Sequence, residues 1–404
     1  MESIRELYHI GNGPSSSHSI GPRLAADLFR QRYPDVSRYR VTLYGSLAAT
    51  GKGHMTDSAI YSAFQPKPTE IVWKPDEVLP LHPNGMMFEP IGEEGISQGS
   101  WKVYSIGGGT LKDEDGFIKY PQTYDLDSMS AIQLYCSQRG LSFWEFVEQA
   151  EGPSIWEYLE HVREVMCAAI DRGIHAEGVL PGGLGVSRKA WAFYRKYKIS
   201  GDNFITEGRL PAYALAVAEE SASGGKIVTA PTCGSSGVVP AVLHYIKENI
   251  DCREDTILRA LATAGLIGNL IKTNASISGA EVGCQGEIGA ACSMAAGAAT
   301  QLLGGTIRQV EYAAEMGLEH HLGLTCDPVE GLVQIPCIER NVFAASRAIS
   351  CANFALFSDG THRVSFDAVV EVMHQTGHDL PSLYRETSTG GLAKSYLFPP
   401  ASGS

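Results

Sequence analysis

Residues 287–305 read EIGAACSMAAGAATQLLGG, a run of Ala, Gly, Ser and Cys with few bulky side chains. Small residues let neighbouring backbones approach closely, so a helix of this composition is usually central and tightly packed. We therefore predict a buried core helix here. Cys284 lies just before the run, which brings a reactive side chain close to the predicted core.

Helical periodicity continues on both sides of this run. Apolar residues recur at intervals of three and four in five long segments. These are Ile155–Arg172, Leu210–Ala222, Val238–Ile250, Asp255–Leu270 and Val342–Phe357. The first part of the chain differs, because short runs of β-branched and aromatic residues predict strands at Arg40–Leu43, Glu70–Trp73 and Trp101–Ile106. Helical spacing also occurs at Arg23–Arg32.

These patterns predict an α+β N-terminal domain followed by a mostly all-α domain. The chain has 404 residues, which exceeds the size of one compact core, so two domains are expected. We place them at residues 1–150 and 151–404. The polar, acidic stretch Ser142–Gly152 is the candidate join between them.

Composition excludes several classes of function. The net charge is -13 and the pI is about 5.4, whereas nucleic-acid binding needs a basic surface. No apolar run reaches the roughly 20 residues that span a bilayer, and Met1–Tyr8 lacks the apolar segment of a signal peptide. We expect a cytoplasmic enzyme with no membrane or nucleic-acid partner, and a homodimer as its assembly.

Nine cysteines are spread over the chain, an odd number that disfavours a disulfide framework. Cys284, Cys326 and Cys337 lie at loop or helix-edge positions flanked by Gly or Pro, whereas Cys292 and Cys351 lie in helical runs as packing residues. A structural zinc site is disfavoured because there is no pair of Cys-x-x-Cys knuckles. Three thiolates can instead hold three irons of a four-iron cluster, which leaves the fourth iron open.

Four polar loops are candidate binding sites, although helix caps and structural histidines explain such residues equally well. A serine-rich loop precedes a predicted helix start, where amides and hydroxyls suit a carboxylate. Two further loops carry histidines between glycines and prolines, a setting that suits a catalytic base. The candidates are Ser15, Ser16, Ser17 and His18; His54; His82 and Asn84; and Thr273 and Asn274.

The motifs occur together in a specific order. They are Gly-Pro-Ser-Ser-Ser-His from Gly13, Tyr-Gly-Ser-Leu-Ala from Tyr44, His-Pro-Asn-Gly-Met from His82 and the three cysteine loops. From about residue 9 to Ala393 the chain resembles the bacterial iron–sulfur L-serine dehydratases. The resemblance implies the family's β domain and its cluster-binding α domain, fused in one chain. It also implies conversion of L-serine to pyruvate and ammonia at a 4Fe-4S cluster, without pyridoxal phosphate.

The resemblance assigns roles to the candidate residues. Cys284, Cys326 and Cys337 match the cluster ligands, and His54 and His82 match candidate bases, which it does not rank. The Ser15–His18 loop, Asn84 and the Thr273–Asn274 region match substrate-cleft motifs. Two departures stand out. The segment between His54 and His82 is shorter than in longer fused members, and residues 398–404 lack the terminal cysteine that caps the open iron in some of them.

Three other functions compete with this interpretation. A cysteine desulfidase has a similar cluster-binding part, matching residues 160–393, but lacks the N-terminal domain. A pyridoxal-phosphate enzyme needs a Schiff-base lysine and a phosphate loop, and the candidates Gly107–Gly109 and Lys226 lie in different predicted domains. An iron–sulfur redox sensor that binds DNA conflicts with the charge of -13. L-Serine and L-threonine remain alternatives as substrate.

Overall fold

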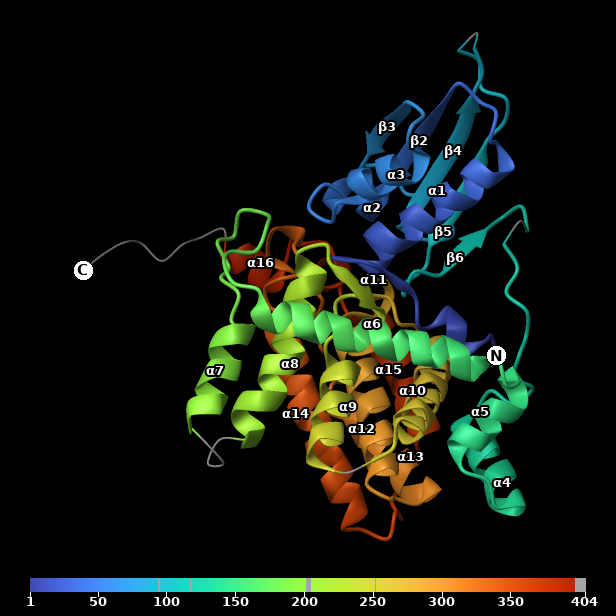
Figure 1. Cartoon of the computed structure of the whole chain (residues 1–404). Coiled ribbons are helices and arrows are strands. Elements are labelled where there is room, and N and C mark those ends of the chain that lie inside the picture. The colour runs from blue at the N-terminus through green and yellow to red at the C-terminus, as the bar shows by residue number, and fades with distance from the viewer. Residues whose placement is uncertain (94, 117, 201–204, 251, 397–404) are drawn as a thin grey trace.

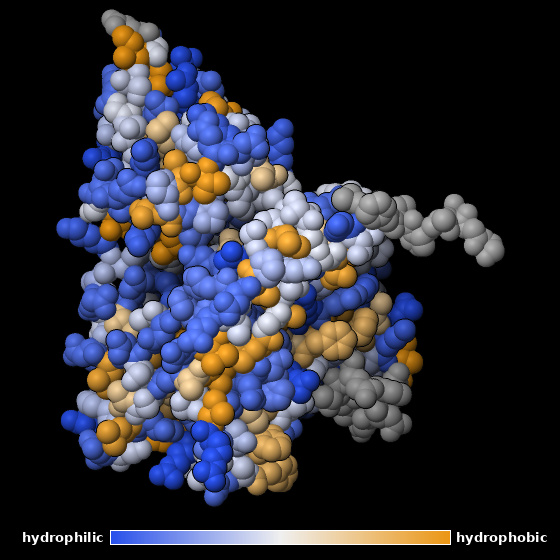
Figure 2. Space-filling view, turned by 180° about the vertical axis from the view of Figure 1, so that it is seen from behind, coloured by the Kyte–Doolittle hydropathy of each residue, from blue (hydrophilic) through white to orange (hydrophobic). Residues whose placement is uncertain are grey.

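The computed structural model describes residues 1–93, 95–116, 118–200, 205–250 and 252–396. It has two parts, a smaller α/β part built mainly from residues 21–113 and a larger body of helices beneath it (Figure 1). Seen from behind, the narrower α/β part rises from the broader helical body, and hydrophilic side chains cover most of this face (Figure 2). The fold class predicted from the sequence is confirmed.

The α/β part is one five-stranded sheet with strand order β3-β2-β4-β5-β6. Strands β2 and β3 are parallel, with Val41 opposite Ile71, and the other neighbours are antiparallel, with Val41 opposite Phe88. Helices α1 and α3 cover the sheet and share its buried core. The elements are α1 Gly21–Arg32, β2 Arg38–Tyr44, α2 Gly45–Thr50, α3 Thr56–Phe64, β3 Thr69–Lys74, β4 Gly85–Ile91, β5 Trp101–Ser105 and β6 Leu111–Asp113.

The helical body surrounds α12, whose side chains are buried along almost its whole length. Helices α9, α10, α13 and α14 pack around it, so the predicted central helix of small residues is confirmed. The body comprises α4 Met129–Arg139, α5 Phe143–Glu151, α6 Ile155–His175, α7 Ala190–Ser200, α8 Ile205–Ala222, α9 Val238–Asn249, α10 Glu254–Asn274, α11 Gly279–Val282, α12 Ala290–Leu302, α13 Ile307–Glu319, α14 Cys337–Leu356, α15 Phe366–Asp379 and α16 Gly391–Tyr396.

Close packing between α12 and α13 depends on Gly317. A Cβ at this position would lie 2.8 Å from the Cα and 2.9 Å from the backbone nitrogen of Ser293. These are backbone atoms, so the two helices must separate to accept a methyl group. We expect Gly317→Ala to lower the free energy of unfolding by about 1–3 kcal/mol, measured by denaturant titration. The exposed variant Glu319→Ala on the same helix serves as the control, and an unchanged Gly317→Ala midpoint would contradict this packing.

The two parts are joined at several places along the chain. Strand β1 (Ile10–Asn12) pairs with β7 (Lys226–Val228), and the side chains of Ile4, Leu7 and Tyr8 are buried in the helical core. After β5 the chain turns through Gly107–Gly109, all with positive φ. A Cβ on Gly108 would lie 2.7 Å from the Ile277 side chain, so this turn packs directly on the helical body.

The stretch Ser142–Gly152 is helical and not an open linker. Ser142 and Glu145 form a reciprocal capping box, and α5 buries Phe143, Phe146 and Val147 in the helical core. The acidic residues of this stretch suggested a link between domains, but its apolar side chains pack in the helical core. The division into 1–150 and 151–404 stays a prediction. Of the described residues, no helix is long and apolar enough to cross a membrane.

Candidate active site at the junction of the two parts

The serine-rich loop reaches the junction because Gly13 lets it approach the helical body. A Cβ on Gly13 would lie 2.1 Å from the carbonyl oxygen of Ser221, at the end of α8. Residues Ser16–Ile20 form a turn of π-helix that leads into α1, and the Ser15 hydroxyl caps it by accepting a hydrogen bond from the His18 amide at 3.1 Å. The side chains of residues 15–19 are buried.

His18 is held by hydroxyl groups on both sides of its ring. Its Nδ1 lies 2.9 Å from the Ser17 Oγ, and its Nε2 lies 3.2 Å from the Ser46 Oγ. Burial, together with the nearby His54, keeps the pKa of His18 well below the usual range. The ring is therefore neutral and serves as a hydrogen-bonding group.

His54 packs against His18, with ring centroids 4.5 Å apart. The Ser19 hydroxyl donates to the His54 carbonyl at 2.6 Å, which fixes the loop between α2 and α3. His54 is 1% exposed, and neither ring nitrogen has a hydrogen-bond partner among the described residues. Burial lowers its pKa to about 4. A neutral imidazole with a free lone pair is thus present at neutral pH.

This burial makes stability depend on pH. The folded pKa of about 4 lies below the unfolded value of about 6.5, so protonation favours unfolding and stability falls as pH drops below 6.5. We expect His54 to account for a loss of about 2 kcal/mol between pH 7 and pH 5. Denaturant unfolding at both pH values should show that the free energy of unfolding decreases less between pH 7 and pH 5 in His54→Gln than in the wild type. Equal losses in the two proteins would show that the pKa of His54 is not lowered.

His82 and Asn84 lie on the loop that leads into β4. The backbone amide of Asn84 donates a hydrogen bond to the His82 Nδ1 at 3.0 Å. The lone pair of Nδ1 is therefore engaged, and a neutral ring carries its hydrogen on Nε2. That nitrogen lies 3.6 Å from the Glu281 Oε1. Burial lowers the pKa of His82, and Glu281 opposes this effect. His82 is therefore arranged as a donor through Nε2.

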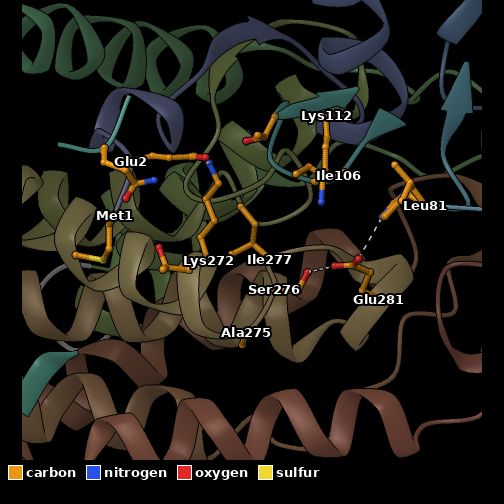
Figure 3. A pocket seen from close by; sticks show the side chains of 15 residues that line it. Met1, Glu2, Leu81, Ile106, Lys112, Lys272, Ala275, Ser276, Ile277 and Glu281 are labelled. Atoms are coloured by element: carbon orange, nitrogen blue, oxygen red, sulfur yellow. Dashed lines mark hydrogen bonds and ion pairs between the residues drawn. The ribbon is translucent and has the colours of Figure 1, made fainter. Parts of the chain in front are cut away.

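A pocket of about 360 Å³ opens beside His82 at the junction. Lys112 enters it from the α/β part and Lys272 from the helical body, and Glu281 binds the Ser276 hydroxyl at its edge (Figure 3). His82 thus borders this pocket, whereas His54 lies in the interior. Thr273 also lines the pocket. The side-chain amide of Asn274 instead donates to the backbone carbonyl oxygens of Asp127 and Leu270, at the surface.

Several buried polar atoms around these loops have no hydrogen-bond partner among the residues that the structure describes. Besides both nitrogens of His54, they are His82 Nε2, Asn84 Oδ1, Ser105 Oγ, Ser278 Oγ and Ser388 Oγ. Buried polar groups are nearly always hydrogen-bonded, and leaving one unpaired costs about 1–3 kcal/mol. A small ligand rich in donors and acceptors would satisfy them. The junction therefore has the character of a binding site for a polar molecule.

The three candidate cysteine ligands come from separate segments of the helical body, and their thiols lie near one another. Cys284 ends the turn after α11, Cys326 lies in the loop after α13, and Cys337 begins α14. Burial raises the pKa of all three thiols, that of Cys284 to about 11, and the thiols of Cys284 and Cys337 further raise the pKa of Cys326. Cys292 and Cys351 are buried within α12 and α14, as expected for packing residues.

Two charged residues beside the thiols were not predicted from the sequence as site residues. Arg340 hydrogen-bonds to Cys284 and interacts with all three thiols, and it follows Cys337 by one helical turn. Glu287 lies 3.8 Å from the Cys326 sulfur, and burial raises its pKa. The sequence signal that could have identified Glu287 as a site residue is its position as a single acidic residue before a run of small apolar residues.

The side chains around these thiols suit a cluster better than a single metal ion. Within the described residues, no three His, Cys, Asp or Glu side chains surround a single metal-ion position. Thiolates that each bind a different iron of a cluster need not converge on one point. Three neighbouring thiols, of which Cys284 and Cys326 are buried, with the Arg340 guanidinium beside them therefore have the chemistry that suits a cluster, whose irons would stabilise the thiolate forms.

A strap formed by residues 384–391 completes the site. The Cys326 amide donates to the Tyr384 carbonyl, and the Glu386 amide donates to the Cys326 carbonyl, both at 2.8 Å. Glu386 and Ser388 have positive φ values of 56° and 55°. The Glu386 Oε1 lies 3.9 Å from the His18 Nδ1, so the strap connects the serine loop to the cysteine loop. Residues 397–404, which include the cysteine-free end, lie outside the described residues.

Comparison with known proteins gives consistent matches over nearly the whole chain. A model of the serine dehydratase alpha chain matches residues 114–393, and one of the serine dehydratase beta chain matches residues 3–67 and 62–116. The L-serine dehydratase of Streptomyces coelicolor is 42% identical, with 97% of this chain and 98% of the relative covered. L-serine dehydratase 1 of Escherichia coli is 43% identical, with 97% and 99% covered. The Helicobacter pylori L-serine dehydratase is 38% identical, with 97% and 98% covered.

Proposed function

Since the chain belongs to the serine dehydratase family, we propose that it converts L-serine into pyruvate and ammonia, with a 4Fe-4S cluster held by Cys284, Cys326 and Cys337. The observation that carries the proposal is the 3.9 Å approach of Glu386, on the strap beside Cys326, to His18 of the serine loop. Through this contact the candidate substrate loop and the candidate cluster loop form one buried site.

The serine loop and its neighbours supply the groups that bind the substrate. Ser15, Ser16, Ser17 and His18 are buried at the start of α1, where hydroxyls and amides suit the carboxylate of L-serine. The side-chain Oδ1 of Asn84 is buried and has no hydrogen-bond partner in the described part of the chain, and Thr273 lines the pocket beside His82. Binding of the carboxylate would orient the α-hydrogen and the β-hydroxyl. Asn274 stays a weaker candidate, because its amide is engaged at the surface.

His54 is the proposed base. Removal of the α-hydrogen needs a nitrogen lone pair, and both nitrogens of His54 are unengaged within the described part of the chain. His82 receives the Asn84 amide on Nδ1 and carries hydrogen on Nε2, so a donor role suits it better. The sequence left these two histidines unranked, and the hydrogen-bond pattern favours His54.

The leaving group needs help that protein side chains supply poorly, because hydroxide is unstable as a free product. When bound, the cluster would supply a Lewis acid through its iron without a cysteine ligand. Loss of the α-proton to His54 and of the hydroxyl from the β-carbon gives an enamine. The enamine tautomerises to an imine, and water then releases pyruvate and ammonia.

Substrate comparison tests this proposal. Protein purified without oxygen should form pyruvate and ammonia in equal amounts from L-serine. L-Cysteine should react at most slowly, whereas faster release of sulfide would favour a cysteine desulfidase. L-Threonine should react more slowly, because its extra methyl group has to fit the same buried site. Added hydroxylamine should leave the activity unchanged, since no pyridoxal phosphate takes part.

The assembly and the location are separate proposals. A homodimer is proposed as the working form, and sedimentation of the anaerobic enzyme would test it. The cytoplasm is the proposed compartment, since an oxygen-sensitive cluster needs reducing surroundings. Limited proteolysis near residue 150 would test the proposed division into residues 1–150 and 151–404.

A further inference from the structure

L-Serine carries three polar groups, and two of them have partners in the proposed function. The serine loop would bind the carboxylate, and the cluster, when bound, would supply a Lewis acid for the hydroxyl. The α-ammonium has no assigned partner, although a buried cation needs an anion close by. A partner for this third group can be assigned from the structure if the proposed function holds.

Glu386 lies between the two assigned subsites. Its Oε1 is 3.9 Å from the His18 Nδ1, and its amide is bonded to the carbonyl of Cys326. Its side chain is only 11% exposed. The α-carbon of serine carries both the carboxylate and the ammonium, and the hydroxyl is on the neighbouring β-carbon, so a partner for the ammonium has to lie close to both of the other subsites. Glu386 occupies the corresponding place in the protein.

Among the described residues, neither lysine nor arginine forms an ion pair with the Glu386 carboxylate, whose contact is the buried imidazole of His18 at 3.9 Å. Arg340 interacts with the thiols and with Glu287. Arg385, the adjacent residue, donates from Nη1 to the Glu281 carbonyl at 3.2 Å. A bound cation would therefore complete the electrostatics of this carboxylate.

The backbone of the strap holds Glu386 in place. Positive φ values are unusual and strained for residues other than glycine, so they persist where the surroundings impose them. Glu386 and Ser388 both have them, and the Ser388 hydroxyl is also buried without a partner within the described ranges. The strap thus presents two polar side chains to the interior of the junction.

We propose that Glu386 binds the α-ammonium of L-serine and thereby selects amino acids over hydroxy acids that lack an amino group. The ammonium would lie between Glu386 and the carboxylate subsite at Ser15–His18. Its positive charge would pair with the Glu386 carboxylate. A substrate of the same shape without the amino group would leave this carboxylate unpaired.

The test compares L-serine with 3-hydroxypropanoate, which has the same carboxylate and hydroxyl but no amino group. In the holoenzyme, Glu386→Gln should raise the KM for L-serine at least ~30-fold, as expected for removal of one partner of a buried charge pair. The inhibition constant of 3-hydroxypropanoate should stay the same or fall. Glu386→Asp, which keeps the charge, should recover part of the preference for L-serine.

Controls separate this role from others. Glu315→Gln removes a buried carboxyl on α13, away from the junction, and should leave both constants unchanged. Iron and sulfide contents should match the wild type in all variants, and calorimetric binding of both ligands provides a readout independent of turnover. If Glu386→Gln lowers kcat while the ratio of the two constants is unchanged, Glu386 transfers protons and the ammonium subsite is refuted. A wild type that does not turn over L-serine refutes the proposed function itself.

Discussion

Cys337→Ala is expected to lose the metal group. Its kcat/KM should fall at least ~1,000-fold, because Lewis-acid stabilisation of a leaving hydroxide contributes several kcal/mol. Cys337 begins α14, and its thiol interacts with that of Cys284 in a buried setting. Two remaining thiolates would hold a cluster poorly. Iron and acid-labile sulfide per chain, measured on anaerobically purified protein, should both fall together with pyruvate formation.

Cys351→Ala is the matched control for this experiment. Cys351 lies on the same helix, is 3% exposed and packs within the helical core. Its replacement should cost about 1 kcal/mol of stability through a small cavity and should leave iron content and activity intact. If Cys337→Ala keeps its iron and its activity, or if Cys351→Ala loses them, the assignment of the ligands is wrong.

His54→Gln is expected to lower kcat by roughly 100- to 10,000-fold, the usual contribution of a positioned base. The KM for L-serine and the iron content should change little, because His54 is proposed to act on the α-hydrogen alone. His82→Gln should have a smaller effect on kcat, since its Nδ1 already accepts the Asn84 amide. His161→Gln on the exposed face of α6 serves as the control.

Exchange of the α-hydrogen adds a second measurement for His54. The wild type in deuterated water should place deuterium at the α-carbon of recovered L-serine if proton removal is reversible, and His54→Gln should lose this exchange with the turnover. A larger loss of kcat in His82→Gln than in His54→Gln would reverse the ranking of the two histidines. Near-normal turnover in both variants would remove the histidines from the mechanism.

The sequence predicted the regular parts of the fold well. The five long periodic segments fall in α6, α8, α9, α10 and α14, and the three strand-like runs fall in β2, β3 and β5, with at most one predicted residue beyond the end of an element. Strand β4 was not predicted, because its sequence contains two methionines and Pro90 in place of alternating β-branched residues. The sequence also hid the packing of Ile4 and Leu7 in the helical core, which depends on contacts with residues far along the chain.

For the site, local motifs revealed the groups that sit on their own loops. Ser15–His18, His54 and His82 all lie at the junction, and Cys284, Cys326 and Cys337 are neighbours there. Glu386 and Ser388 were not predictable, because contacts with residues far away in the sequence, such as the bridge between Cys326 and Arg385, bring their segment into the site. The ranking of His54 above His82 as candidate base also uses a hydrogen bond from a backbone amide to His82, which no local sequence pattern encodes.

The central claim is that serine elimination in this chain depends on a cluster held by three cysteines. The most direct test is to purify the protein without oxygen, count iron and sulfide, and assay pyruvate formation from L-serine on the same sample before and after exposure to air. About four irons and four sulfides per chain are predicted, with activity that falls in air in parallel with the loss of iron. Full activity in protein that contains no iron would contradict the account.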